Sequence, residues 1–491
     1  MEAAIRTDVS ETGDDLLAQL GRMTGHLRDE LLGRVAAARR DPRWVALWDQ
    51  CANETGRDDP RWFADSVAQA ITCGLVAVRS AAAQVLPPRA VDWLLTQADP
   101  LVGTVLRICF DRDVGAECED CSGGAGGNGF KSLGELRQYL QRDRLSVLEQ
   151  SFVVPAERGD PCCDFYEQFL QAYDGRARRR QGVFYTPASI VSFMVRSVDA
   201  LLRDEFSLPA GLADESSWRQ VDRERTPGAG ASVFGPLPFV QVLDPAMGTG
   251  GFLLEVFDHV HRSVRERLAG AGFGGVAPTD GWNAYVARGL LSRIRGYDVM
   301  LAPVVLAQIQ LAVRLARTGY SFQHAARIQF FLANTLEQPR PEHDPRVCPL
   351  TVILGNPPFS GISENRSPWI AGLLRGQPRH RGRAVADYFE VDGCRLRERK
   401  HWLHDDYVKF IRYCHWLVES TGAGMVALVT NHGFLDNATF RGMRQQLLKT
   451  FPRISVVDLH GNMRSGRVAS GGGPDEGVFP VGQGVAMSFL A

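Results

Sequence analysis

A short polar motif behind an apolar run is the part of the sequence best suited to chemistry. The motif is Asn356-Pro357-Pro358-Phe359, and it follows the apolar run 350–355. Such a run is typical of a buried strand, and open α/β sheets build their sites at the carboxyl ends of strands. The Asn356 side-chain oxygen and the backbone carbonyl beside it could accept both hydrogens of an amino group, while Phe359 offers a base an aromatic face. The motif therefore predicts chemistry on the exocyclic amino group of a purine, although by itself it could also be a turn.

A second motif indicates a nucleotide-like cofactor. A strand pattern over 239–243 leads into the glycine-rich stretch 244–252, where a helix begins. Glycines in such a turn let the backbone approach a ligand that a Cβ would exclude. The alternative is a dinucleotide-binding turn, but the spacing of Gly248, Gly250 and Gly251 differs from the full dinucleotide fingerprint. The next strand pattern ends in Asp298, which suits two ribose hydroxyls and, as an isolated acid, could equally be a solvated loop residue.

Nine motifs in order give the sequence a resemblance to a known family. Besides 244–252 and 356–359 they are 182–187, 296–298, 334–336, 430–436, 440–444, 458–462 and 483–486. The chain resembles gamma-class adenine-specific DNA methyltransferases, most closely the methylase region of Type ISP and Type I-like restriction-modification enzymes, over roughly residues 160 to 491. The resemblance implies transfer of a methyl group from S-adenosylmethionine to the N6 amino group of an adenine flipped out of double-stranded DNA, in restriction-modification or phage defence.

The resemblance also implies roles for single residues. Thr186 and its neighbour Tyr185 would contact the methionine part of S-adenosylmethionine. Asp244 and Gly248 would form the floor beneath it, with Ala246 and Gly250 in the same cofactor-binding turn, and Asp298 would hold the ribose hydroxyls. Many relatives place an aspartate after the third strand to accept from the cofactor's adenine amino group. This chain has Asn334-Thr335-Leu336 there, so either Asn334 or Thr335 is expected in that role.

The strand patterns predict the fold class. They are 239–243, 293–297, 328–332, 351–354, 425–430, 454–459 and 484–490, with helical segments between the early ones. Alternating strands and helices favour a parallel doubly wound sheet. The short connection 461–482 cannot hold a crossover helix, so the last two strands should pair antiparallel. The predicted fold is α/β, a seven-stranded Rossmann-like S-adenosylmethionine methyltransferase sheet with a reversed last strand.

The hydrophobic periodicity changes near residue 160. Helical spacing before it predicts an α-helical domain over 1–160, ahead of a methyltransferase domain over 161–491. The helical domain could pack on DNA or a partner, or serve only as scaffold. Glycine- and proline-rich stretches at 226–238 and 269–281 are expected to be surface loops.

Composition restricts the class of protein and its partners. The net charge is −1, with 45% hydrophobic and 23% charged residues, which is ordinary for a soluble protein. No apolar run is long enough to span a membrane and no secretory pattern opens the chain, so a cytoplasmic protein is expected. DNA contacts must then come from local basic clusters. One is Arg176 to Arg180; the other, between Arg366 and Lys400, could be a solvated face or a loop that contacts phosphates.

Cysteine spacing raises one alternative. Cys118 and Cys121 form a C-x-x-C pair that Cys162 and Cys163 could complete as a zinc set. The glycine-rich surroundings and the adjacency of the last two favour reduced thiols and no metal.

Some expected parts of restriction-modification enzymes were not found in the sequence. No phosphate-binding loop of an ATP-driven motor is present, and the resemblance places a target recognition domain beyond the seventh strand, outside this sequence. A fragment, a decayed gene product, or a separate target-recognition or restriction subunit as partner would each account for this. A catalytically silent subunit that binds S-adenosylmethionine or DNA is the alternative function. Methylation of RNA bases or of release-factor glutamine is a third, disfavoured because motifs 184–187 and 458–462 follow the restriction-type pattern.

Overall fold

The structure of the protein is a computed structural model. It describes residues 13–37, 42–82, 85–111, 130–141, 161–181, 186–225, 234–270, 277–323, 327–340, 344, 347–358, 363, 365–377, 385–396, 401–462, 477–479 and 483–491. Predictions for Cys118, Cys121, Tyr185 and Phe359 therefore lie outside the described residues.

The first part of the chain is helical, as its periodicity predicts. Its helices are α1 (Gly13–Ala37), α2 (Pro42–Thr55), α3 (Pro60–Ala77), the π-helical turn η2 (Val78–Ala82), α5 (Pro88–Gln97), α6 (Pro100–Phe110), α7 (Lys131–Gln141) and α9 (Pro161–Gln181). Asp59 and Asp99 cap α3 and α6 by accepting a backbone N–H, and a proline follows each where no N–H is needed. Although α9 begins after residue 160, it packs on α1 and lies with the N-terminal helices.

The second part is built on a seven-stranded sheet. Its strands are β1 (Val242–Asp244), β2 (Ile294–Asp298), β3 (Gln329–Leu332), β4 (Val352–Gly355), β7 (Met425–Asn431), β8 (Ile454–Asp458) and β9 (Val485–Leu490), in the order β3-β2-β1-β4-β7-β9-β8. Neighbours from β3 to β7 pair parallel, while β9 runs antiparallel to both β7 and β8. The predicted sheet and its reversed last strand are confirmed.

The largest difference between a predicted and an observed strand is at the start of β1, while the other strands agree to within one residue at each end. The first strand begins at Val242 rather than at Phe239, because the residues before it run beside another segment. The Phe239 N–H donates to the Ser216 carbonyl, and Pro238 forms an antiparallel bridge with Ser217. Phe239 and Val240 are buried, so their apolar character reflects packing next to the sheet rather than pairing within it.

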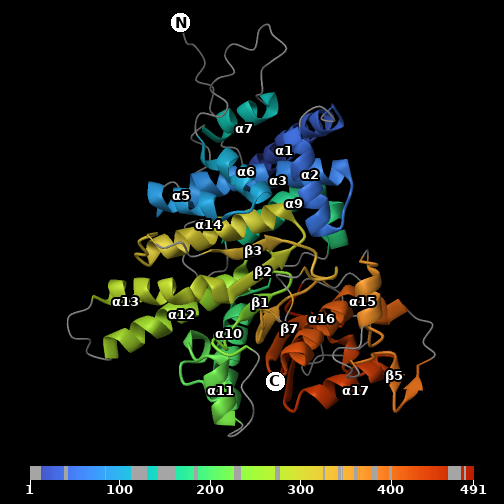
Figure 1. Ribbon diagram of the computed structural model, residues 1–491. Coiled ribbons are helices and arrows are strands. Elements are labelled where there is room, and N and C mark those ends of the chain that lie inside the picture. The colour runs from blue at the N-terminus through green and yellow to red at the C-terminus, as the bar shows by residue number, and fades with distance from the viewer. Residues whose placement is uncertain are drawn as a thin grey trace, which may run out of the picture.

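Helices cover both faces of the sheet (Figure 1). They are α10 (Ala188–Phe206), η6 (Gly211–Ala213), α11 (Trp218–Arg225), α12 (Gly251–Gly270), α13 (Pro278–Tyr285), η7 (Val286–Leu290), η8 (Leu291–Arg293), α14 (Leu301–Arg317), α15 (Pro368–Leu373), η10 (His401–His404), α16 (Asp406–Thr421), η11 (His432–Phe434), η12 (Ala438–Phe440) and α17 (Arg441–Thr450). A small hairpin, β5 (Glu390–Val391) with β6 (Cys394–Arg395), packs on α17. The loop predicted at 269–281 is wrong at both ends, because α12 extends to Gly270 and Pro278 opens α13. None of the helices in the described ranges is long and apolar enough to cross a membrane.

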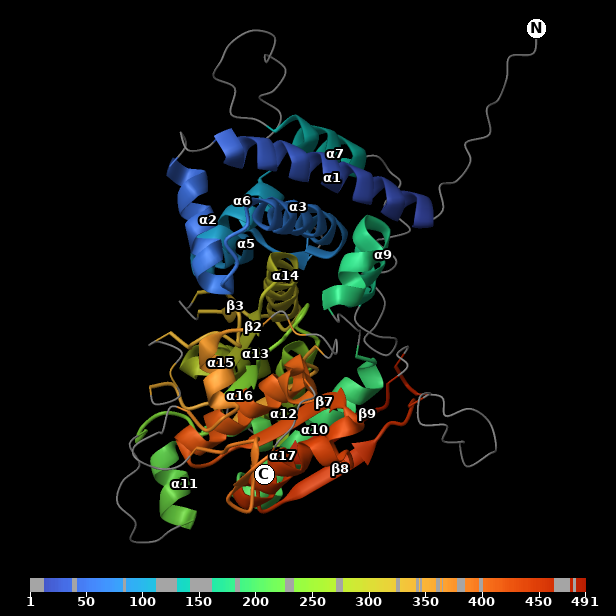
Figure 2. The same cartoon turned by 90° about the vertical axis from the view of Figure 1, so that its right-hand side faces the viewer.

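The N-terminal helices join the sheet through α14. Figures 1 and 2 show α14 between the sheet and the N-terminal helices, with α3 directly against it. Gly74 of α3 permits this approach, since a Cβ there would lie 2.6 Å from the Cys109 sulfur and 3.3 Å from Val305 of α14. One continuous cluster of buried apolar residues runs from α1 to β9. The helical part is thereby fixed to the half of the sheet that carries β2 and β3.

Candidate active site

Glycines let the two motif-bearing strands end close together. β1 and β4 are neighbours, and their carboxyl ends carry Asp244 and Asn356. A Cβ on Gly355 would lie 2.5 Å from Asp244 Oδ1. Gly355 is therefore a site residue that the sequence did not single out, although its place directly before Asn356 was a usable signal.

Asn356 is held by a residue far away in the chain. Its side-chain Nδ2 donates to the Thr186 hydroxyl oxygen at 2.9 Å. This bond turns the amide oxygen away from Thr186, the orientation that an acceptor of amine hydrogens requires. Pro357 is buried behind it and Pro358 is half-buried. The structure thus brings together the 356–359 motif and the motif that ends in Thr186-Pro187.

Asp244 is a carboxylate enclosed by protein. It is fully buried, and burial raises its pKa to about 8, with a further contribution from the nearby charge of Asp298. Its Oδ1 accepts the Ala246 N–H at 3.0 Å. Its Oδ2 has no hydrogen-bond partner within the described part of the chain. A buried acceptor without a donor is costly, and it suits a site that receives a donor or a cation from a ligand.

The glycine-rich turn has one side open. Gly248 has φ +55, and a Cβ built on it meets nothing within 4 Å; the same space is open at Gly251. Gly250 differs, because its Cβ would lie 3.1 Å from Ala307 of α14. Gly250 therefore allows the turn to pack on α14, and a direct cofactor contact from it stays a prediction.

Asp298 supports that turn from β2. Its Oδ2 accepts the Gly248 N–H at 2.9 Å and its Oδ1 accepts the Met300 N–H at 2.8 Å. Burial raises its pKa to about 6, and these backbone donors oppose the rise. A carboxylate has about four acceptor positions. The N–H groups of Gly248, Met300 and Val299 occupy three of them, which leaves one for a hydroxyl donor. Asp298 and the open side of Gly248 thus fit a ribose next to a nucleotide-like group.

The two candidates after β3 already bind protein groups. The Thr335 hydroxyl is buried and donates to the Pro245 carbonyl at 2.5 Å. The Asn334 amide oxygen accepts the Leu336 N–H at 3.1 Å, and its Nδ2 donates to Asn365 Oδ1 at 3.1 Å. Each oxygen can still accept a further hydrogen bond. An adenine contact by one of these two residues therefore stays a prediction.

The basic clusters are only partly described. Arg366 is exposed, Arg395 is exposed on β6, and the Arg375 guanidinium lies 4.1 Å from the centre of the Phe389 ring. Arg176 to Arg180 lie within α9, but their side chains are outside the described part, as are residues 378–384 and 397–400. The choice between a solvated face and a phosphate-binding loop stays open.

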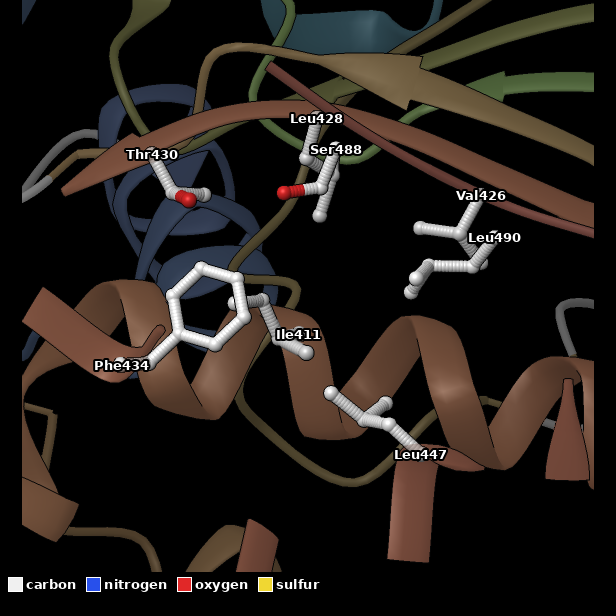
Figure 3. A pocket seen from close by; sticks show the side chains of 8 residues that line it. All are labelled: Ile411, Val426, Leu428, Thr430, Phe434, Leu447, Ser488 and Leu490. Atoms are coloured by element: carbon white, nitrogen blue, oxygen red, sulfur yellow. The ribbon is translucent and has the colours of Figure 1, made fainter. Parts of the chain in front are cut away.

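A small cavity lies elsewhere in the fold. It is lined by side chains of β7, β9, α16, α17 and η11, among them Ile411, Phe434 and Leu447 (Figure 3). Thr430 and Ser488 direct hydroxyls toward it, and neither hydroxyl has a hydrogen-bond partner within the described residues. No residue of the two motifs lines this cavity, so it is separate from the candidate site.

Comparison with known proteins agrees with this arrangement. The chain matches the family model described as N-6 DNA Methylase over residues 157–210 and 232–451, which is more than half of its length. The methylase subunit of the Type I restriction enzyme EcoEI from Escherichia coli is 26% identical over 202 residues, a match that covers 41% of this chain and 28% of that protein.

Solved structures share the fold along nearly the whole chain. A cryo-EM structure of a DrdV–DNA complex has a TM-score of 0.58 at 20% identity, covering 98% of this chain and 42% of that one. The ATP-dependent Type ISP restriction-modification enzyme LlaBIII bound to DNA has a TM-score of 0.62 at 17% identity, covering 97% of this chain and 29% of that one. The chain spans less than half the length of these proteins, and at such identities the likeness shows the fold. The family model matches more than half of the chain, and the two motifs lie at neighbouring strand ends, so this chain belongs to the N-6 DNA Methylase family.

Proposed function

We propose that this chain is the catalytic part of an adenine-specific DNA methyltransferase that uses S-adenosylmethionine, acting in restriction-modification or phage defence. The observation that supports this most is the bond from Asn356 to the Thr186 hydroxyl at 2.9 Å. It joins the motif suited to an amino group to the motif expected to contact the methyl donor. Reaction at the amine requires these two groups side by side.

The residues of the cofactor half fit S-adenosylmethionine. Asp298 would accept from a ribose hydroxyl, the open side of Gly248 would admit the nucleoside, and Thr186 with Tyr185 would contact the methionine part. Asp298 places negative charge where a cation would bind, and a bound cation would also favour ionisation of Asp244, whose pKa burial raises to about 8. When bound, S-adenosylmethionine supplies an electrophilic methyl group on a positively charged sulfur.

Asn356 and the proline pair would act on the adenine. The Asn356 side-chain oxygen and backbone carbonyl would accept the two amine hydrogens, which draws the nitrogen lone pair out of the purine ring. The same acceptors would stabilise the positive charge that develops on the nitrogen as it bonds to the methyl carbon and the carbon–sulfur bond breaks, with the electron pair left on sulfur. The surplus proton on the nitrogen would then pass to water. Pro357 and Pro358 hold the backbone rigid, while Phe359 would stack on the flipped base. Double-stranded DNA in the cytoplasm is the proposed substrate, and a separate target-recognition or restriction subunit is a candidate partner.

Mass spectrometry of DNA from cells expressing the protein tests this proposal. N6-methyladenine should appear with the wild type and with the exposed control Asn53→Ala, and should be absent with Asn356→Ala. Binding of S-adenosylmethionine without any methylated DNA would instead favour the catalytically silent subunit. Methylated RNA or protein with unmodified DNA would contradict the DNA substrate.

A further inference from the structure

A polar cluster built on two buried charged residues lies beyond the catalytic motif. We call it the anchor cluster, and it consists of Asn334, Ser363, Asn365, Asp406 and Lys409. Lys409 is 3% exposed and Asp406 7%, both in the first turn of α16. Asn365 lies nine positions after Asn356, so the cluster meets the chain shortly after the catalytic motif.

The contacts of the anchor cluster converge on Asn365 and Ser363. The Lys409 ammonium donates to the Asn365 carbonyl at 2.5 Å and also to the Ser363 hydroxyl. The Asn365 side-chain Nδ2 donates to Asp406 Oδ2 at 3.1 Å, and the Ser363 hydroxyl donates to Asp406 Oδ1. Ser363 and Asn365 are therefore both hydrogen-bonded to α16, Asn365 through its main chain as well as its side chain.

Asn334 extends the anchor cluster to the N-terminal helices. Its Nδ2 donates to Asn365 Oδ1, while its backbone N–H donates to the Glu54 carbonyl at 2.9 Å. Glu54 lies in the last turn of α2, and its carboxylate pairs with Arg340 at 2.8 Å. A continuous series of hydrogen bonds thus runs from α2 through the end of β3 to the segment after the catalytic motif.

The energetics of the anchor cluster favour a role beyond stability. Burying an ammonium and a carboxylate costs several kcal/mol per ion, which their attraction only partly offsets, so well-packed apolar residues would often stabilise a fold as much. Burial accordingly lowers the pKa of Lys409, and Asp406 opposes that shift. What the charged pair adds is directed hydrogen bonds that hold one main-chain segment in one place.

We propose that Asp406 and Lys409 are positioning residues that fix the far end of the segment beginning at Asn356, and that Asn334 couples this anchor to the C-terminal end of α2. The inference rests on the proposed function, because Asn356 is the residue to be positioned. Neither Asp406 nor Lys409 touches the reacting groups. Through Asn334, α2 thereby contributes to the position of Asn365, nine residues after Asn356.

The experiment uses the double variant Asp406→Asn with Lys409→Met. Removing both charges leaves no unpaired ion, so the protein should fold with a near-normal Tm. Loss of the anchor should lower the single-turnover rate constant for methyl transfer by ~10–100-fold, since small displacements of a reacting group have effects of this size. The Kd for S-adenosylmethionine should stay unchanged. The control is Glu419→Gln, which weakens the buried pair with Arg412 in the same helix and should change Tm but not the rate constant.

Hydrogen–deuterium exchange gives a readout that does not need activity. Amides between Asn356 and Arg366 should exchange at least ~10-fold faster in the double variant, as local opening becomes easier, with no change in the control. Unchanged exchange, or a wild-type rate constant in a folded double variant, would overturn the anchor. If the wild type itself does not methylate DNA but the exchange changes as stated, the proposed function fails while the anchor stands.

Discussion

Asn356 and Thr186 are 170 positions apart in the chain, yet the Asn356 amide donates to the Thr186 hydroxyl at 2.9 Å. One residue follows β4 and the other precedes α10, so the bond depends on the whole sheet being assembled. The contribution of this bond to the candidate site can be tested by changing Thr186, the residue expected to contact the cofactor.

Thr186→Val removes the acceptor that orients Asn356 while keeping the shape of the side chain. We expect kcat to fall by about 10-fold, corresponding to the loss of one hydrogen bond of ~1.4 kcal/mol. Thr186→Ser retains the hydroxyl and should recover most of the rate. If the serine variant were as slow as the valine variant, the methyl group of Thr186 rather than its hydroxyl would matter.

Asp298→Ala should weaken binding of S-adenosylmethionine by ~1–3 kcal/mol, because the acceptor for a ribose hydroxyl is lost. It should also lower Tm, since the Gly248 and Met300 N–H groups lose their acceptor. Calorimetry well below the variant's Tm separates the two effects, with the exposed Asp280→Ala as control. Wild-type affinity in Asp298→Ala would remove this residue from the cofactor site.

Asp244→Asn should stabilise the protein most at alkaline pH. The folded-state pKa of about 8 is above the ordinary value of 3.8. The contribution of Asp244 to the free energy of unfolding is therefore fully present below about pH 4 and is lost as the pH rises through 8. An asparagine does not ionise, and the gain in Tm over wild type should therefore grow from pH 5 to pH 9. Thermal unfolding across that range measures the difference, and a gain that does not grow with pH would show that the pKa of Asp244 is not raised in the folded protein.

Thr430→Val should raise the free energy of unfolding by about 1 kcal/mol, because it replaces a buried hydroxyl that has no partner among the described residues with a methyl group. The matched control is Thr351→Val. The Thr351 hydroxyl donates to the Phe239 carbonyl and accepts the Gln241 N–H, so this change should destabilise by ~1–3 kcal/mol. Destabilisation by Thr430→Val in denaturant titrations would show that a bound water satisfies its hydroxyl.

The sequence was a good guide to the sheet and to the ends of its strands. Strand-length patterns that end in an aspartate or lead into Asn356 identified β1, β2 and β4 and placed Asp244, Asp298 and Asn356 at one edge. Such patterns arise from residues that are adjacent in the sequence, so they can be recognised without knowledge of the fold.

Contacts between distant segments could not be predicted in the same way. Periodicity marks α3 and α14 as amphipathic but does not say that Gly74 allows them to meet. The hydrogen bonds of the Asn334 amide to Asn365 and to its own turn also had no sequence signal, and the expected role of Asn334 or Thr335 at the cofactor stays a prediction. The burial of Lys409 had no sequence signal, since a lysine in the first turn of a helix is usually solvated.

The central claim is that Asn356 acts on the amine and not on cofactor binding. Single-turnover transfer of a labelled methyl group to duplex DNA, measured with the Kd for S-adenosylmethionine on the same preparation, tests this most directly. For Asn356→Ala we predict a rate lower by at least ~100-fold at an unchanged Kd. A variant that methylates adenine as fast as the wild type, or that loses rate only because it no longer binds the cofactor, would contradict the account.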